Sequence, residues 1–114
     1  MRAADQVLRD LVNGLSDRFI HIKKISGKWV PVSEADELRL RTVELFDGFA
    51  KPDFILIRPE AWKRYTNGFD PSVIAEQLKR RGVLIGSGSE MSKSEEVLGK
   101  SSRFYVLKRA TLTA

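Results

Sequence analysis

The chain has 114 residues, of which 42% are hydrophobic and 31% charged, and its net charge is +5. This length supports one hydrophobic core, so we expect a single domain spanning residues 1–114. The chain has no cysteine, which excludes disulfides, thiol catalysis and zinc ribbons. Its longest apolar runs, such as residues 54–57, are far shorter than the roughly 20 residues of a membrane helix. We expect no signal peptide, a cytoplasmic location and no membrane partner.

The positive charge is concentrated in the second half of the chain. Residues 1–57 hold nine Lys/Arg and nine Asp/Glu, whereas residues 58–114 hold eleven Lys/Arg and six Asp/Glu. A local excess attracts a polyanion better than the same charge spread evenly, because a phosphate backbone is itself a dense line of charge. A surplus that only keeps a small domain soluble is the alternative interpretation.

The first half of the chain predicts one helix followed by a β-rich insertion. Apolar residues recur at helical spacing from Val7 to Leu15, which predicts a helix over residues 3–14 that ends at Gly14. β-branched and aromatic residues at 19–22 and 29–32 flank Ser26-Gly27 and predict a hairpin. Pro31 places its second strand at a sheet edge. An acidic turn is expected at 34–37, and the alternation in 38–41 slightly favours a strand up to residue 45, so 18–50 is interpreted as a β insertion.

The second half predicts a helix-turn-helix followed by a hairpin. A strand at 54–57 leads into a short helix that begins at Pro59 and ends near Asn67-Gly68. Asp70 as N-cap and Pro71 at the first position begin a second helix, which Gly82 ends. A buried strand at 83–85, a Ser- and Gly-rich hairpin with a mobile tip at 86–102 and a returning strand at 103–108 complete the segment.

These elements predict an α+β fold, namely a winged helix-turn-helix. The expected domain has three helices, a small antiparallel sheet and an inserted N-terminal β-hairpin. Residues 67–70 form the turn between the paired helices. The hairpin at 86–102 is the wing, and the helix-turn-helix and wing together occupy residues 54–108.

The segment from Gly48 to Val106 resembles the C-terminal domain of bacterial mobile-element helicase–primase proteins, which prophages, plasmids and integrative elements carry. The matching residues are Gly48-Phe49, Phe54-Ile55-Leu56-Ile57, Pro59-Glu60-Ala61-Trp62, Gly68-Phe69-Asp70-Pro71, Ala75, Leu78, Gly82-Val83-Leu84 and Arg103-Phe104-Tyr105-Val106. The resemblance covers about half of the chain. It implies a winged-helix domain attached to a replication helicase or ATPase, with DNA as partner, and it supplies no active site. One departure concerns the wing, where the negative charges of Glu90, Glu95 and Glu96 offset the positive charges of Lys93 and Lys100. A wing of this composition is a poor phosphate-binding element.

Candidate nucleic-acid contacts lie mainly on the second helix of the pair. Arginine and glutamine read base edges, and lysine and serine suit phosphates. Because the basic run ends the helix, whereas base contacts usually come from its beginning, we expect mainly backbone contact. Cations that complement the helix dipole are an equally good interpretation of this run. The candidates are Ser72, Gln77, Lys79, Arg80 and Arg81 on this helix, Lys63 and Arg64 on the preceding one, and Lys93, Lys100 and Arg103 on the wing.

Catalytic and metal-binding patterns are not evident in the sequence. His21 is the single histidine, so a transition-metal site is not expected, and we predict neither a cofactor nor an enzyme. The acidic residues at 34–37 are interpreted as a solvated turn, and residues 86–89 lack the Gly-Lys-Ser/Thr of a phosphate loop. Trp62 is interpreted as a core residue, with base stacking as the alternative.

Two functional hypotheses follow from these patterns. The first is a non-catalytic nucleic-acid-binding accessory domain of a mobile-element replication or transfer protein. The alternative is a protein-interaction module that docks on a replication ATPase or another partner. The near-neutral wing and the apolar residues at 29–32 favour the alternative.

Overall fold

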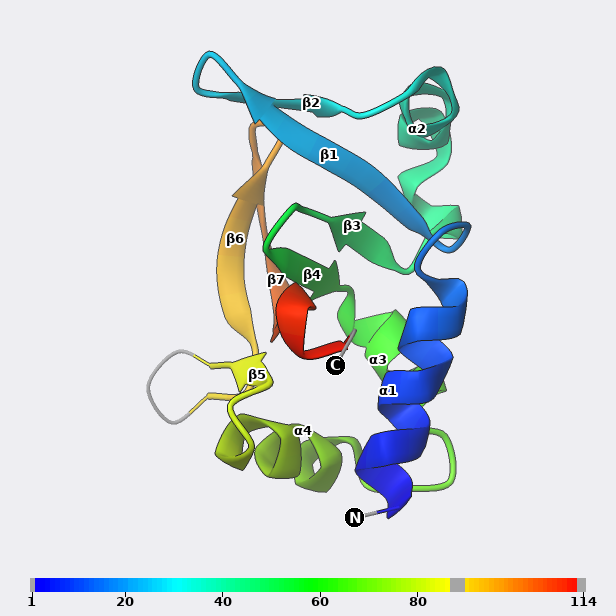
Figure 1. Ribbon diagram of the computed structural model, residues 1–114, viewed down its shortest axis with the longest axis vertical. Coiled ribbons are helices and arrows are strands. Elements are labelled where there is room, and N and C mark those ends of the chain that lie inside the picture. Colours follow the sequence, from blue (N-terminus) through cyan, green and yellow to red (C-terminus); the bar gives the residue numbers. More distant parts are fainter. Residues whose placement is uncertain (1, 87–89, 113–114) are drawn as a thin grey trace.

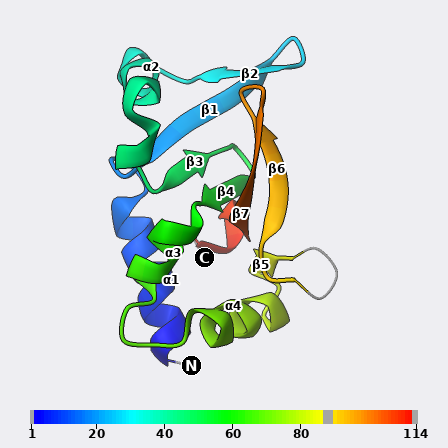
Figure 2. The same ribbon diagram turned by 180° about the vertical axis from the view of Figure 1, so that it is seen from behind.

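A computed structural model describes residues 2–86 and 90–112, without the side chain of Arg2, and shows an α+β fold (Figures 1 and 2). In chain order the elements are α1 (Arg2–Gly14), β1 (Phe19–Ile25), β2 (Lys28–Pro31), α2 (Glu34–Arg39), the 3-10 segment η1 (Leu40–Leu45), β3 (Gly48–Ala50), β4 (Phe54–Ile57), α3 (Pro59–Tyr65), α4 (Pro71–Arg80), β5 (Leu84–Ile85), β6 (Lys93–Val97), β7 (Lys100–Lys108) and the 3-10 turn η2 (Arg109–Leu112). No helix in this part of the chain is long and apolar enough to cross a membrane.

The described strands form one sheet in the order β2-β1-β3-β4-β7-β5, with β6 paired to β7 beside β5. All of these pairings are antiparallel except the parallel contact of β1 with β3. Two-residue turns join β1 to β2 and β6 to β7, and their residues have positive φ: 50° and 80° at Ser26-Gly27, and 53° and 84° at Leu98-Gly99. This backbone matches the twist of the flanking strands in a tight hairpin. β2 is an edge strand, as Pro31 predicted.

The sheet separates two apolar clusters. On one face α1, α3 and α4 pack against the strands, and the fully buried Trp62 stacks on Tyr105 with ring centroids 4.8 Å apart. On the other face η1 and the two hairpins enclose a second cluster of Ile20, Ile22, Phe49, Leu56, Val97, Phe104 and Val106. Strand alternation explains the division, since Phe104 and Val106 point to one face of β7 while Tyr105 and Leu107 point to the other.

The helix boundaries of the second half follow the predicted caps. The Asp70 carboxylate accepts hydrogen bonds from the backbone N–H groups of Ser72 at 2.9 Å and Val73 at 3.3 Å, and Pro71 occupies the first turn of α4. Gly82 follows the helix with a φ of 75°. The prediction for α3 was slightly too long, because the helix ends at Tyr65. The expected core position of Trp62 is confirmed, and burial removes its ring from any base.

Residues 34–45 form a helix and a 3-10 segment that is kinked at Thr42, which corrects the predicted turn and strand. Ser33 caps α2 by accepting a hydrogen bond from the Asp36 N–H at 3.2 Å. Asp36 is buried rather than solvated: it accepts hydrogen bonds from the His21 N–H at 2.8 Å and the Ser33 hydroxyl at 2.7 Å, and pairs with Arg39 at 3.5 Å. The described chain therefore has four α-helices instead of three, and the insertion is mixed rather than purely β.

The wing is more regular than predicted. Strands β6 and β7 continue to the two-residue turn at Leu98-Gly99, so the tip of this hairpin is tight rather than a long polar loop. Part of the segment for which we expected mobility, residues 87–89, lies outside the described residues.

Candidate nucleic-acid interface

The two paired helices are joined rigidly near their turn. The indole N–H of Trp62 in α3 donates a hydrogen bond to the Pro71 carbonyl at the start of α4, at 3.1 Å. The Phe69 N–H donates to the Thr66 carbonyl at 2.8 Å, which closes the turn. Ile74, Ala75 and Leu78 bury one side of α4, whereas the opposite side of the helix is exposed. In a helix-turn-helix, the exposed side of the second helix is the one that faces DNA.

The C-terminal end of α4 carries the expected cations, and two of them already have acidic partners. Arg80 lies 2.5 Å from the Glu76 carboxylate one turn earlier, and both side chains are exposed. Arg81 donates to Asp5 of α1 at 3.0 Å, and this hydrogen bond lowers the pKa of the Asp5 carboxyl. Lys79 is half-buried, with its ammonium beside Gly86. Because ion pairs of exposed side chains are weak and screened by salt, a phosphate can compete for the two guanidinium groups.

The N-terminal end of α4 carries no cation on its exposed side, and its N-cap Asp70 is an exposed carboxylate. Ser72 and Val73 are exposed there, and Phe69 in the turn is also exposed, so apolar surface replaces the cations that would contact phosphates. Gln77 is half-buried, and its Oε1 is a buried atom with no hydrogen-bond partner among the described residues. Half-burial makes Gln77 a weaker candidate contact than the exposed Ser72, Arg80 and Arg81.

On α3 the two candidate cations differ. Lys63 is exposed, and its side chain makes no ion pair within the described part of the chain. Arg64 pairs with Asp47, whose side chain is only 2% exposed. Arg18 donates to the same carboxylate through Nε at 3.3 Å and a terminal nitrogen at 3.1 Å, and the Tyr65 hydroxyl donates to it as well. Arg64 therefore has a structural role besides any contact with a ligand.

The buried Asp47 joins three parts of the fold. Its carboxylate holds Arg18 before β1 and both Arg64 and Tyr65 of α3, and its backbone bonds to Arg18 and Arg58 at 2.8 and 2.9 Å. Burial opposes ionisation, yet the hydrogen bonds from Arg18, Tyr65 and Arg64 outweigh it and lower the pKa of Asp47. Burial and Asp47 together raise the pKa of the Tyr65 hydroxyl. No local sequence signal identifies this cluster, because its donors lie 17 to 29 positions from Asp47 along the chain.

Two of the three candidate cations on the wing also have acidic neighbours. Arg103 contacts Glu90 and donates to the Ser92 hydroxyl at 3.1 Å and the Ser92 carbonyl at 2.7 Å. Lys93 lies 4.0 Å from Glu95. Lys100 stands next to the hairpin turn and is exposed. The structure thus brings the wing candidates together on one hairpin, and Arg103 lies near the basic end of α4, because its partner Glu90 and the Lys79 ammonium both lie beside Gly86.

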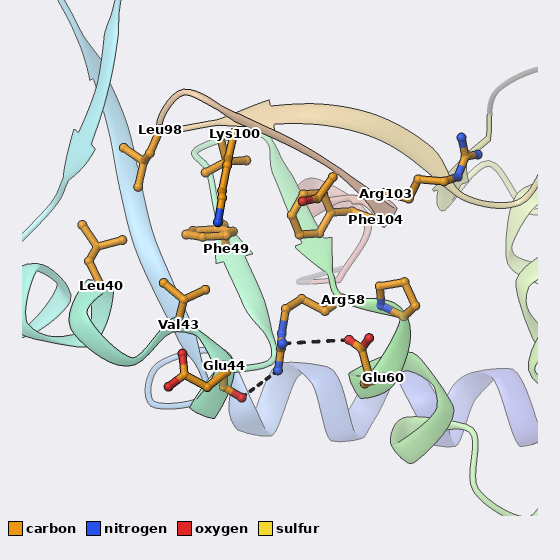
Figure 3. Close-up of a pocket in the computed structure, with 13 residues that line it drawn as sticks. Leu40, Val43, Glu44, Phe49, Arg58, Glu60, Leu98, Lys100, Arg103 and Phe104 are labelled. Atoms are coloured by element: carbon orange, nitrogen blue, oxygen red, sulfur yellow. Dashed lines mark hydrogen bonds and ion pairs between the residues drawn. The ribbon is translucent and has the colours of Figure 1, made fainter.

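A groove of about 750 Å³ lies between the wing, η1 and the start of α3 (Figure 3). Its apolar lining comes from both sides of the gap: Leu40, Val43, Phe49, Val97, Leu98 and Phe104. Arg58 forms one wall, where it donates to the carbonyls of Glu44 at 2.8 Å and Phe46 at 2.9 Å. Leu98 has a φ of 53°, a left-handed conformation that is rare for a leucine, and is 43% exposed at the edge of the groove.

The described residues contain no group of three or more His, Cys, Asp or Glu side chains that could hold a metal ion. Comparison of the chain with models of protein families and with curated proteins found no match.

Proposed function

We propose that this protein is a non-catalytic nucleic-acid-binding domain that contacts phosphates with the C-terminal end of α4. The observation that carries the proposal is a pair of tightly joined helices whose second member leaves its outer side uncovered and ends in three consecutive cations, Lys79, Arg80 and Arg81. In a helix-turn-helix the second helix is the element that meets the nucleic acid.

The order of the strands and helices supports this proposal. Strands β4, β7 and β5 lie side by side in that order, and all of their pairings are antiparallel. Helices α3 and α4 connect β4 to β5, and the β6–β7 hairpin extends from the same sheet (Figure 1). With residues 19–50 treated as an insertion, this is the order of helices and strands that we expect for a winged helix. The hairpin is then the wing.

The distribution of charge supports backbone contact rather than base reading. Arg80 and Arg81 lie at the end of α4, whereas Ser72, Val73 and Glu76 occupy the part of the helix that usually enters the major groove. Glu76 is already paired with Arg80, and this part of the helix has no lysine or arginine to bind a guanine edge. We infer binding with little sequence preference. The resemblance to mobile-element helicase–primase proteins further suggests DNA as the ligand and a helicase or ATPase domain as neighbour.

The test compares single charge removals at the two ends of the molecule. Arg80→Gln removes a cation from α4, and Arg41→Gln is the matched control on η1, which lies at the opposite end from α4 (Figure 1). Both residues are exposed. We expect Arg80→Gln to weaken binding of a generic DNA duplex or single strand, measured by fluorescence anisotropy at low salt, by about threefold to tenfold. If the two variants bind DNA with equal affinity, the end of α4 does not contact the nucleic acid.

A second candidate function is docking of a protein partner in the groove beside the wing. The observation that favours it is Leu98, which is exposed at the hairpin tip with a positive φ next to the apolar lining of the groove. Backbone strain of this kind is often associated with function. Leu98→Ser would weaken capture of a helicase or ATPase partner under this hypothesis and would leave DNA affinity unchanged.

A further inference from the structure

Two lysines lie over one aromatic ring where the two β-hairpins approach each other, and a third lysine lies beside them. Lys24 on β1 is the register partner of Trp29 on β2, and its Nζ lies 5.9 Å from the centroid of the Trp29 ring. The Nζ of Lys51, which follows β3, lies 4.4 Å from the same centroid. From β6, Glu95 places one carboxylate oxygen 4.0 Å from Lys51 Nζ and the other 4.0 Å from Lys93 Nζ. We call these five residues the hairpin-junction cluster.

The sheet brings these side chains to one face. Lys24 follows Ile20 and Ile22 at alternate positions of β1, and Lys51 follows Phe49 two residues later. Lys93 is the register partner of Phe104. Alternate positions share a face, and cross-strand partners do as well. The cluster therefore lies at the margin of the second apolar cluster, on the face of the sheet opposite α1, α3 and α4.

Positive charge in the cluster exceeds negative charge. The cluster holds three lysines and one carboxylate: Lys51 and Lys93 share Glu95, no ion pair of Lys24 is found among the described residues, and Lys51 is only 8% exposed. Burial lowers the pKa of Lys51, Glu95 raises it, and the nearby Lys24 and Lys93 lower it further. Lys28 and Glu96 line a small cavity beside Trp29, but their opposite charges cancel. A partly buried cation is stable only when nearby negative charge offsets its loss of water. Here a single carboxylate, 4.0 Å from Lys51, is the negative charge in a cluster of three lysines.

We propose that the hairpin-junction cluster binds a phosphate group. Lys24 and Lys93 hold the anion at the surface, and the partly buried Lys51 supports it from below, in competition with Glu95. Lys24 and Lys51 already lie over the Trp29 ring, so the site takes a phosphate rather than a stacked base. The group belongs either to a nucleic-acid backbone or to a small phosphorylated ligand. The site shares no residue with α4, so it does not rest on the function proposed for that helix.

Removal of the competing carboxylate gives the sharpest test. Glu95→Gln should tighten anion binding about fivefold, which is the effect of removing one unit charge about 4 Å from the bound group in a water-like medium. Glu37→Gln is the matched control: it removes the same charge from an exposed position on α2 and should leave affinity within about twofold. A purely structural role of Glu95 predicts a loss of stability in Glu95→Gln and no gain in affinity.

The measurement is tryptophan fluorescence during titration with inorganic phosphate and, separately, with a short single-stranded oligonucleotide. Trp62 is fully buried against Tyr105, so the response belongs to Trp29 and should be absent in Trp29→Phe. Lys51→Met should weaken binding by at least about tenfold, because it removes a charge-assisted contact. A melting curve for each variant checks the fold. If Lys51→Met does not fold, the phosphate affinity of Glu95→Gln alone tests the proposal.

Each outcome has one meaning for the proposal. Tighter binding of the oligonucleotide alone by Glu95→Gln assigns a nucleic-acid backbone, and tighter binding of inorganic phosphate alone assigns a small phosphorylated ligand. Tighter binding of both supports a general phosphate site. If Glu95→Gln binds both probes with the same affinity as the unsubstituted protein, the proposal is overturned. Arg80→Gln should leave phosphate affinity unchanged, so a failure of the α4 interface is recognised separately.

Discussion

Substitution of Asp47 by asparagine tests how the insertion is held to the paired helices. The carboxylate is 2% exposed and accepts hydrogen bonds from Arg18, Arg64 and Tyr65. Asparagine keeps one acceptor oxygen and directs an NH₂ group at donors, so it loses the charge and about half of the contacts. Hydrogen bonds to a charged group are worth about 1.5–3 kcal/mol each.

The expected loss of stability is about 2–3 kcal/mol. This is below the roughly 3–5 kcal/mol for breaking a fully buried ion pair, because the Arg18 and Arg64 side chains are 48% and 55% exposed and regain water. For a chain of this size we expect the melting temperature to fall by about 8–12 °C. Urea unfolding at neutral pH measures the difference, and Asp17→Asn, which removes an exposed carboxylate beside Arg18, is the control.

The effect of Asp47→Asn should also depend on pH. The pKa of Asp47 is lowered in the folded protein from 3.8, so the charged form stabilises the fold. This contribution is fully present above the unfolded pKa near 4 and is lost as the pH falls through the lower folded pKa. The stability difference between the unsubstituted protein and Asp47→Asn should therefore shrink below about pH 4. Equal stabilities of the two proteins at neutral pH would refute this account of the cluster.

Two further substitutions test the backbone of the sheet. A Cβ at Gly48 would lie 1.8 Å from the Leu56 carbonyl oxygen, so Gly48→Ala should lower the free energy of unfolding in urea by about 3 kcal/mol or more. Gly27→Ala is the control: its Cβ meets open space at a φ of 80°, and it should lower the free energy of unfolding by about 1 kcal/mol. Similar losses for the two alanines would contradict the close approach of β3 to β4. Leu98→Asn should raise stability by about 0.5–1 kcal/mol, because asparagine tolerates the positive φ of this turn. A lower melting temperature would show that the Leu98 side chain packs more tightly than its exposure indicates.

Elements with strong local signals could be predicted from the sequence. The Asp70-Pro71 cap, the Ser26-Gly27 hairpin turn and the stop at Gly82 depend on neighbouring residues, and the structure has each of them. The α1 helix was also predicted within one residue of its start. These features need no distant partner, so a short stretch of sequence contains their physical cause.

Residues 38–45 show why the rest could not be predicted. Their alternating pattern indicated a strand, but Leu38 and Leu45 are 58% and 66% exposed in the structure, so the apolar residues do not mark one buried face. Leu40 and Val43 instead pack on the second apolar cluster from the two sides of a kink at Thr42, whose φ and ψ are not helical. The capping of α2 by Ser33 and the burial of Asp36 against His21 stabilise the helix that leads into this segment.

The candidate functional residues show the same difference between local signals and long-range contacts. Sequence reasoning found the basic end of α4, because consecutive cations are visible in any single stretch of chain. It missed Asp47 and the hairpin-junction cluster, whose members come together only when β1 pairs with β3 and the two hairpins approach each other. It also could not show that Arg80, Arg81 and Arg103 have acidic neighbours, which lie 4 to 76 positions away.

The most direct test of nucleic-acid binding through α4 is the salt dependence of affinity for a generic DNA duplex and single strand. We predict that log Kd rises linearly with log salt concentration, and that the double variant Arg80→Gln, Arg81→Gln reduces the slope on duplex DNA by about 1.8, or 0.9 per lost phosphate contact. A melting curve verifies that this variant is folded. Affinity independent of salt, or the same slope for the double variant and the unsubstituted protein, would contradict the proposed interface.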